Sequence, residues 1–268
     1  MINLTQFEQA GYRVRHDEKK SRYYQRMIDL LGGLEQVRLF RHDYLLRLFS
    51  NAQFKKGRAY TVDELKTLAA PKNQTDAFFD NLTWLAGKSI LLRGYNLRCP
   101  DCHLEHWYPL GSTAEHVTCW GCGTTFQMPL QHPFAYRLNQ HFIEGLNQGA
   151  AAVLLTALYL SEVCQKSLDW QTGLLFERDG QTVDIDLIAE CDDKLMFAEC
   201  KNDLKGDVIE QLQRGIEVAK RCNAAMYVFA VLQAPPLSLG EFVEEALFPI
   251  RLITRDALMG NETDRSRT

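Results

Sequence analysis

Two short segments decide the fold of this chain, Val183-Asp184-Ile185-Asp186-Leu187-Ile188 and Phe197-Ala198-Glu199-Cys200-Lys201-Asn202. Charged and apolar residues alternate in both, as in β-strands, where residues two apart share a face. We therefore predict that Asp184 and Asp186 lie on one face of a strand, and Glu199 and Lys201 on one face of the next. Unpaired buried charges are costly, and a divalent cation would relieve that cost for the carboxylates on this face. We therefore predict a bound divalent cation, held by Asp186, Glu199 and the Cys200 carbonyl.

The elements around these segments follow from apolar periodicity and turn residues. Helical segments are expected from Phe134 through the Ala150–Leu160 run and from Asp207 to Cys222. Strands are expected at 169–178, 182–190, 194–201 and 225–232, and the first ends in a turn signal, Arg178-Asp179-Gly180. A short helix and a short strand are expected at 241–247 and 249–254. Helix, three strands, helix and strand is an α/β order with a mixed sheet.

This order, with Asp186 followed by Glu199-x-Lys201, resembles the PD-(D/E)XK nuclease superfamily and its restriction-endonuclease-like fold. The resemblance covers roughly residues 135–235. It implies that Asp186 and Glu199 bind Mg²⁺ or Mn²⁺ and that Lys201 acts as a catalytic base or electrostatic stabiliser. Many members add a glutamate from the first helix, for which Glu144 and Glu162 are candidates. Gln211 resembles a polar residue that some members place near the site, and Asp184 is a further accessory candidate.

Four cysteines form the clearest local motif. Cys99 and Cys102 make one C-x₂-C pair, and Cys119 and Cys122 make a second. Two such pairs supply the tetrahedral thiolate shell that structural zinc prefers, with no position left for a substrate. The segment resembles a zinc ribbon, so we expect one structural Zn²⁺.

The bonding state expected of the remaining cysteines depends on the cell compartment. No apolar run reaches the roughly 18 residues of a membrane span, and the N-terminus lacks a secretory pattern. A cytoplasmic protein without a membrane segment is therefore expected, in which disulfides are the poorer interpretation. Cys164, Cys191 and Cys222 are predicted to fill the core, and Cys200 to be a small buried residue rather than a nucleophile.

The first third of the chain is basic, with 17 Lys and Arg against 10 Asp and Glu in residues 1–98, although the whole chain has a net charge of −4. Helical patterns are found at 24–50, with a break at Gly32-Gly33, at 61 onward and at 74–85, and Thr61 with Glu64 predicts a capping box at the start of the second. Two expected strands at 88–98, which turn at Gly94, follow these helices. This order indicates a winged helix-turn-helix, used either for DNA or for protein packing. For DNA, we predict phosphate contacts from Lys88, Arg93 and Arg98.

The predicted domains are thus a winged-helix-like domain at 1–98, a zinc ribbon at 99–133 and a nuclease-like domain at 134–268. Together they predict a Mg²⁺- or Mn²⁺-dependent DNA endonuclease, resembling bacterial restriction, repair or antiphage-defence components. Such a protein would bind DNA and a larger protein partner, and cutting both strands would favour a homodimer. The alternative is a non-catalytic DNA-binding or adaptor protein. Retention of Asp186, Glu199 and Lys201 together favours the enzyme.

Overall fold

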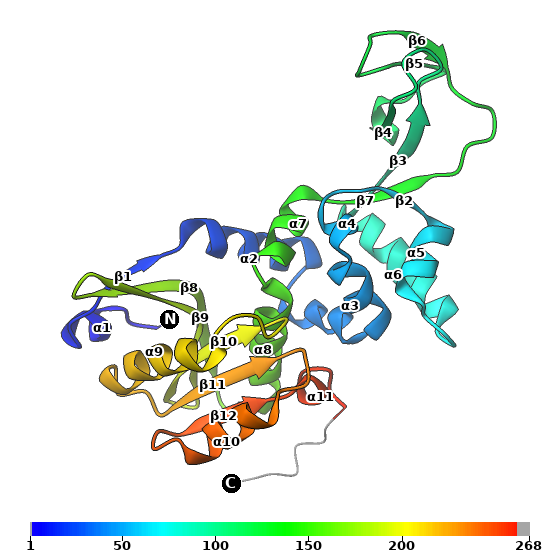
Figure 1. The fold of residues 1–268 in the computed structure, drawn as a ribbon. Coiled ribbons are helices and arrows are strands. Elements are labelled where there is room, and N and C mark those ends of the chain that lie inside the picture. Colours follow the sequence, from blue (N-terminus) through cyan, green and yellow to red (C-terminus); the bar gives the residue numbers. More distant parts are fainter. Residues whose placement is uncertain (1, 262–268) are drawn as a thin grey trace. The chain divides into compact units, whose positions relative to one another are not determined.

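A computed structural model describes residues 2–261 of the chain as a mixed α/β protein (Figure 1). The chain folds into two compact units. One unit combines Met1–Arg41 with Asn147–Thr268, and the other is His42–Leu146. This division differs from the predicted boundaries, because the first 41 residues pack with the C-terminal part and the cysteine-rich segment lies inside the second unit.

The first unit is built on a six-stranded sheet in the order β1-β8-β9-β10-β11-β12. From β1 to β10 neighbouring strands are antiparallel, whereas β10, β11 and β12 are parallel. The strands are β1 (Arg13–His16), β8 (Leu168–Arg178), β9 (Gln181–Cys191), β10 (Lys194–Lys201), β11 (Met226–Val231) and β12 (Ile250–Ile253). The predicted strand positions and the turn at Asp179-Gly180 are confirmed.

The helices of this unit are α1 (Thr5–Gln9), α2 (Glu18–Leu31), the 3₁₀ helix η1 (Leu34–Arg41), α8 (Ala150–Val163), α9 (Val208–Arg221), α10 (Leu237–Glu245) and α11 (Arg255–Leu258). The break after α2 is confirmed: Gly32 caps the helix with a left-handed φ of 92°. No single helix within residues 2–261 is long and apolar enough to cross a membrane, and only the bent pair Gln140–Asn147 and Ala150–Val163 passes that test together.

Two helices cover opposite faces of the sheet. The Cys200 side chain contacts Thr156 of α8, which is buried along most of its length. Tyr227 neighbours Phe197 across β10 and β11 and approaches α9 so closely that a Cβ on Gly215 would lie 2.0 Å from its hydroxyl. Because Phe197 and Glu199 are two residues apart, Glu199 lies on the α9 face.

The structure contains a disulfide between Cys164 and Cys191, whose Cα atoms are 5.6 Å apart. The expectation that these residues are unpaired core thiols is therefore wrong. Cys164 directly follows α8 and Cys191 ends β9. The Asp192 carboxylate, directly after Cys191, accepts hydrogen bonds from the backbone N–H groups of residues 165–167, directly after Cys164, and so holds the two chain segments together. Cys222 is buried, as predicted.

The second unit has a helical part and a four-stranded sheet in the order β2-β7-β3-β4. Its helices are α3 (Asp43–Ser50), α4 (Ala52–Lys55), α5 (Val62–Ala69), α6 (Thr75–Gly87), η2 (Leu110–Ser112) and α7 (Gln140–Asn147). Its strands are β2 (Tyr60–Thr61), β3 (Leu91–Arg98), β4 (Glu105–Pro109), β5 (His116–Thr118), β6 (Thr125–Gln127) and β7 (Ala135–Leu138). The predicted capping box of Thr61 and Glu64 at the start of α5 is confirmed.

The expected hairpin at 88–98 is wrong. Residues Leu91–Arg98 form one strand, which pairs with β7 and with β4. Gly94 is needed for close packing rather than for a turn, because a Cβ there would lie 2.1 Å from the Tyr108 carbonyl oxygen and 2.8 Å from the Trp107 ring. The cysteine-rich segment is consequently an insertion between the paired strands β3 and β7.

Candidate active site

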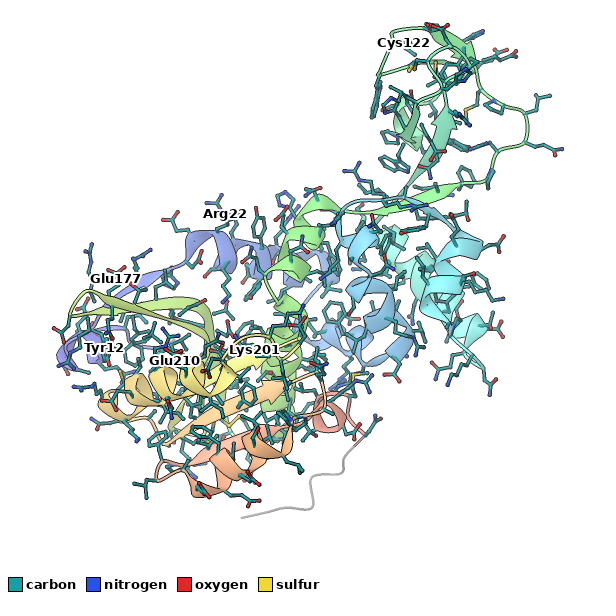
Figure 2. The ribbon with its side chains drawn as sticks, viewed as in Figure 1. Tyr12, Arg22, Cys122, Glu177, Lys201 and Glu210 are labelled. Atoms are coloured by element: carbon teal, nitrogen blue, oxygen red, sulfur yellow. A yellow bond between two sulfur atoms is a disulfide. The ribbon has the colours of Figure 1, made fainter. Side chains whose placement is uncertain are left out.

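The predicted carboxylates and lysine meet where strands β9 and β10 separate. Their antiparallel pairing runs from Lys194 opposite Cys191 to Ala198 opposite Leu187, and stops there. Asp186 and Glu199 are the next residues on the two strands. Figure 2 labels Lys201 at the end of β10. Charged side chains from both strands therefore meet where the strands diverge.

Asp186 and Glu199 are buried, with 8 % and 7 % of their surface exposed. The backbone N–H of Cys200 donates to Asp186 Oδ2 at 2.9 Å. The Lys201 ammonium forms an ion pair with Glu199 Oε1. Burial makes each of these contacts more valuable than it would be in water, since an unpaired buried charge is costly.

A residue that the sequence analysis missed, Lys20, completes the cluster. It comes from α2, is 7 % exposed, and places its Nζ 2.5 Å from Asp186 Oδ1 and 2.8 Å from Asp184 Oδ2. One ammonium contacts both aspartates, which confirms that Asp184 and Asp186 share a face. The cluster thus holds three carboxylates and two ammonium groups.

The N-terminus of α2 is fixed to β8 by local contacts. Asp17 caps the helix by accepting hydrogen bonds from the backbone N–H groups of Lys19 and Lys20. Its own N–H donates to the Gly173 carbonyl at 2.8 Å, and the Ser21 hydroxyl donates to the Thr172 carbonyl at 2.9 Å. A Cβ on Gly173 would lie 2.8 Å from the Ser21 hydroxyl. Glycine at 173 therefore permits the close approach that carries Lys20 into the site.

The protonation of the cluster reflects its burial. Desolvation, together with the charge of Asp186, raises the pKa of Glu199 to about 7, although Lys201 opposes the shift. Desolvation also raises the pKa of Asp184 against the opposing charge of Lys20. Burial alone would lower the pKa of Lys201, but the Glu199 carboxylate outweighs it and raises that pKa. The site therefore has an excess of negative charge that a further cation would relieve.

The pKa of Glu199 predicts how stability depends on pH. Since its pKa is about 7 in the folded protein against an ordinary 4.5, the folded state holds a proton that the unfolded state releases. The free energy of unfolding should fall as the pH rises through that window. In Glu199→Gln protein this loss is absent. Urea unfolding without added divalent cations should show the variant gaining about 2 kcal/mol on the parent between pH 5 and pH 8. An unchanged difference between the two pH values would contradict the assignment.

The donor set suits an oxygen-preferring cation such as Mg²⁺ or Mn²⁺. The N–H and C=O of one strand residue point to the same edge. Because the Cys200 N–H points to Asp186, the Cys200 carbonyl also points toward β9. Asp186, Glu199 and that carbonyl could therefore hold a cation between the strands. Within residues 2–261, only the four cysteines gather three or more potential ligand atoms around one point. In the acidic cluster, Lys20 lies between two of the carboxylates.

The accessory candidates lie in different surroundings. Gln211 is in the first turn of α9, and its Oε1 is buried without a hydrogen-bond partner among the described residues. Glu144 belongs to the second unit, where it accepts a hydrogen bond from Gln140 at 2.9 Å. Glu162, near the C-terminal end of α8, pairs with Arg41 and Arg38. The opposite end of α8 adjoins the site, because the Ala152 N–H donates to the Asn202 side chain.

The four ribbon cysteines form a second candidate site. Their sulfur atoms all lie within 4.8 Å of one another. The Cys99–Cys122 and Cys102–Cys119 pairs are separated by 3.7 and 3.6 Å. A tetrahedral zinc site with Zn–S bonds of about 2.3 Å requires sulfurs about 3.8 Å apart. The four cysteines could therefore bind a zinc ion. Backbone N–H groups of Cys122 and Gly121 lower the pKa of Cys119, which favours the ligating thiolate.

The three cations predicted to contact DNA lie in the second unit, on or beside β3. The Lys88 ammonium lies 5.5 Å from the centre of the Trp84 ring, and the Arg93 guanidinium lies 5.2 Å from that of Phe134. Arg98 donates a hydrogen bond to the His103 carbonyl. Arg93 and Arg98 share the strand that leads into the ribbon, and Lys88 ends the helix that precedes it.

No protein-family model and no curated protein matches the chain. Several solved chains are similar to it, and two of them are described here. Protein VC1899 from Vibrio cholerae has a TM-score of 0.46 and 11 % identity, over 96 % of this chain and 58 % of that one. Can2 from Sulfobacillus thermosulfidooxidans, in complex with cyclic tetra-adenylate, has a TM-score of 0.40 and 8 % identity, over 94 % and 56 %. The chain thus spans little more than half the length of either, and likeness at this level identifies no activity.

Proposed function

We propose that this protein is a Mg²⁺- or Mn²⁺-dependent endonuclease that hydrolyses phosphodiester bonds of DNA. The observation that carries the proposal is the convergence of Asp186, Glu199 and Lys201 where β9 and β10 separate. A purely structural sheet gains little from two buried carboxylates, since each loses its hydration. The same cluster suits a hydrolytic site, because it combines oxygen ligands for a cation with an adjacent ammonium group.

The order of elements supports a restriction-endonuclease-like arrangement. Helix α8 is followed by β8, β9 and β10, and α9 then crosses to β11, which is parallel to β10. Asp186, Glu199 and Lys201 lie where β9 and β10 separate, near the carboxyl end of β10. This is the arrangement that the superfamily resemblance implies for residues 135–235.

The proposed roles follow from the contacts. Asp186 and Glu199 hold the cation together with the Cys200 carbonyl, and the Cys200 N–H fixes the orientation of the Asp186 carboxylate. When bound, the cation polarises the phosphate and activates water. Lys201 is half-exposed, so its ammonium can orient the attacking water and stabilise the charge that develops on the phosphoryl oxygens.

We also propose that the second unit is a winged helix whose wing carries the zinc ribbon. The order of its elements, α3, β2, α5, α6, β3 and β7, with β7 paired between β2 and β3, supports this topology. Helix α6 would face the DNA groove, although Asp76 and Asp80 on it disfavour tight base reading. Lys88, Arg93 and Arg98 would then contact phosphates. The alternative is a winged helix used for packing.

Those phosphate contacts predict a change in salt dependence. Each lost contact should reduce the slope of log K against log salt by about one unit, because fewer counterions are released on binding. A Lys88→Ala, Arg93→Ala, Arg98→Ala triple variant should therefore bind DNA more weakly and with a shallower slope in a fluorescence-anisotropy titration. An unchanged slope would support the packing role instead.

The wider setting is proposed from the superfamily resemblance alone. It is a bacterial restriction, repair or antiphage-defence complex in which a larger partner delivers the DNA. A homodimer would provide two active sites, one for each strand of the DNA.

The proposed activity is tested by incubating the protein with labelled linear, circular and single-stranded DNA. Each substrate is incubated with Mg²⁺, with Mn²⁺, and with neither. Cation-dependent loss of circular DNA is the expected result, because it requires internal cleavage. No cleavage of any substrate with either cation would favour the adaptor alternative.

A further inference from the structure

Each oxygen of the Asp186 carboxylate already accepts one hydrogen bond. Oδ2 accepts the hydrogen bond of the Cys200 N–H, and Oδ1 accepts that of the Lys20 ammonium. The Cys200 N–H belongs to the backbone of β10, so the strand fixes the position of this donor. A cation on Oδ1 would therefore compete with the Lys20 ammonium, which now lies 2.5 Å from that oxygen.

We propose that Lys20 is an internal cation that competes with the divalent cation for Asp186 and keeps the free protein poor in that metal. This inference rests on the proposed function and adds a control to its site. A unit charge within a few ångströms of a buried carboxylate interacts with it strongly, because the effective dielectric there is low. A divalent cation at Oδ1 would meet repulsion from the same ammonium.

The surroundings of Lys20 suit such an exchange. The ammonium has a second partner in Asp184, whose side chain is 47 % exposed. Lys20 can therefore retain one carboxylate when a divalent cation takes the other. The lysine comes from α2, outside the helix, strands and helix that build the site, and Gly173 fixes α2 against β8. Asp184 then serves as a holding partner for Lys20, not as a metal ligand.

Metal binding to the full-length, zinc-loaded protein tests the proposal. Free Mn²⁺ would be followed by electron paramagnetic resonance during titration of the parent, Lys20→Met and Lys19→Met proteins. Lys19 is the matched control because it is the exposed neighbour on the same helix turn. We expect Lys20→Met to bind Mn²⁺ at least about tenfold more tightly than the parent, since the competing charge is gone. Lys19→Met should bind like the parent. Equal or weaker binding by Lys20→Met would overturn the proposal.

A second comparison controls for misfolding of the Lys20→Met protein. It also distinguishes a failure of this proposal from a failure of the proposed function. Lys20→Met leaves two carboxylates unpaired, so the Lys20→Met, Asp184→Asn double variant, which keeps the local charge, is compared with Asp184→Asn alone. The double variant should again bind Mn²⁺ about tenfold more tightly. Asp186→Asn serves as the reference for specific binding. If Asp186→Asn leaves Mn²⁺ binding unchanged, the proposed metal site fails. If Asp186→Asn abolishes binding but removal of Lys20 does not tighten it, only the competition fails.

Discussion

Asp186→Asn and Glu199→Gln proteins should each lose DNA cleavage by about 10³-fold or more, equivalent to about 4 kcal/mol of transition-state stabilisation. Both changes preserve side-chain shape but remove a carboxylate that we assign to the hydrolytic cation. Lys201→Ala should lose cleavage to a similar extent for another reason, because the water and the phosphoryl charge lose their ammonium partner. Initial rates on a labelled circular substrate in saturating Mn²⁺ give the measurement.

Mn²⁺ affinity distinguishes the three variants. Asp186→Asn and Glu199→Gln should bind Mn²⁺ more weakly than the parent, whereas Lys201→Ala should bind it as well or better. Asp184→Asn should lose cleavage only partly. Glu190→Gln is the matched control, since Glu190 lies on the same strand and the same face, four residues beyond Asp186. Parental cleavage rates in Asp186→Asn and Glu199→Gln would refute the superfamily assignment of the site.

Cys119→Ser protein should lose its zinc and the fold of the ribbon. The apolar cluster there contains only three buried residues, Leu97, Tyr108 and Val117, with partly buried neighbours. Such a core is too small to hold a loop-rich segment, so metal binding and folding are coupled. Elemental analysis should find about one zinc per chain in the parent and none in the variant. Limited proteolysis should then cut between residues 99 and 128.

Cys222→Ala is the control for the zinc experiment. Cys222 is buried in the first unit, away in sequence from the C-x₂-C pairs. This variant should retain its zinc and its resistance to proteolysis in the ribbon. A parent protein without tightly bound zinc, or a Cys119→Ser protein that retains it, would contradict the assignment.

The sheet and its charged face could be predicted from sequence because they rest on local periodicity. Alternation with a period of two placed Asp184 and Asp186 on one face, and the turn at Asp179-Gly180 fixed the hairpin. The zinc ligands were equally local, since each pair comes from one tight turn. These features depend on residues close together in the chain, which is where pattern analysis is strongest.

The remainder depends on contacts between distant segments. Gly94 resembles a turn residue, but its lack of a side chain allows Trp107 to pack against it. Trp107 lies on β4, whose pairing with the strand of Gly94 was not predicted from the sequence. The disulfide joins residues 27 apart that come together because β8 and β9 pair with Leu168 opposite Cys191. Lys20 did carry a signal: with Tyr24, Met27 and Leu31 it lies at helical spacing on the buried stripe of α2. A lysine on an apolar stripe indicates a buried partner, and here the partners are more than 160 residues away.

The most direct test of the account is the position of the cation itself. Crystals of the protein grown with Mn²⁺ and a short DNA duplex would be measured for anomalous scattering at the manganese edge. We predict a manganese peak in contact with carboxylate oxygens of both Asp186 and Glu199, separate from a zinc peak among the four cysteines. Manganese bound elsewhere, with Asp186 and Glu199 uncoordinated in the presence of DNA, would contradict it.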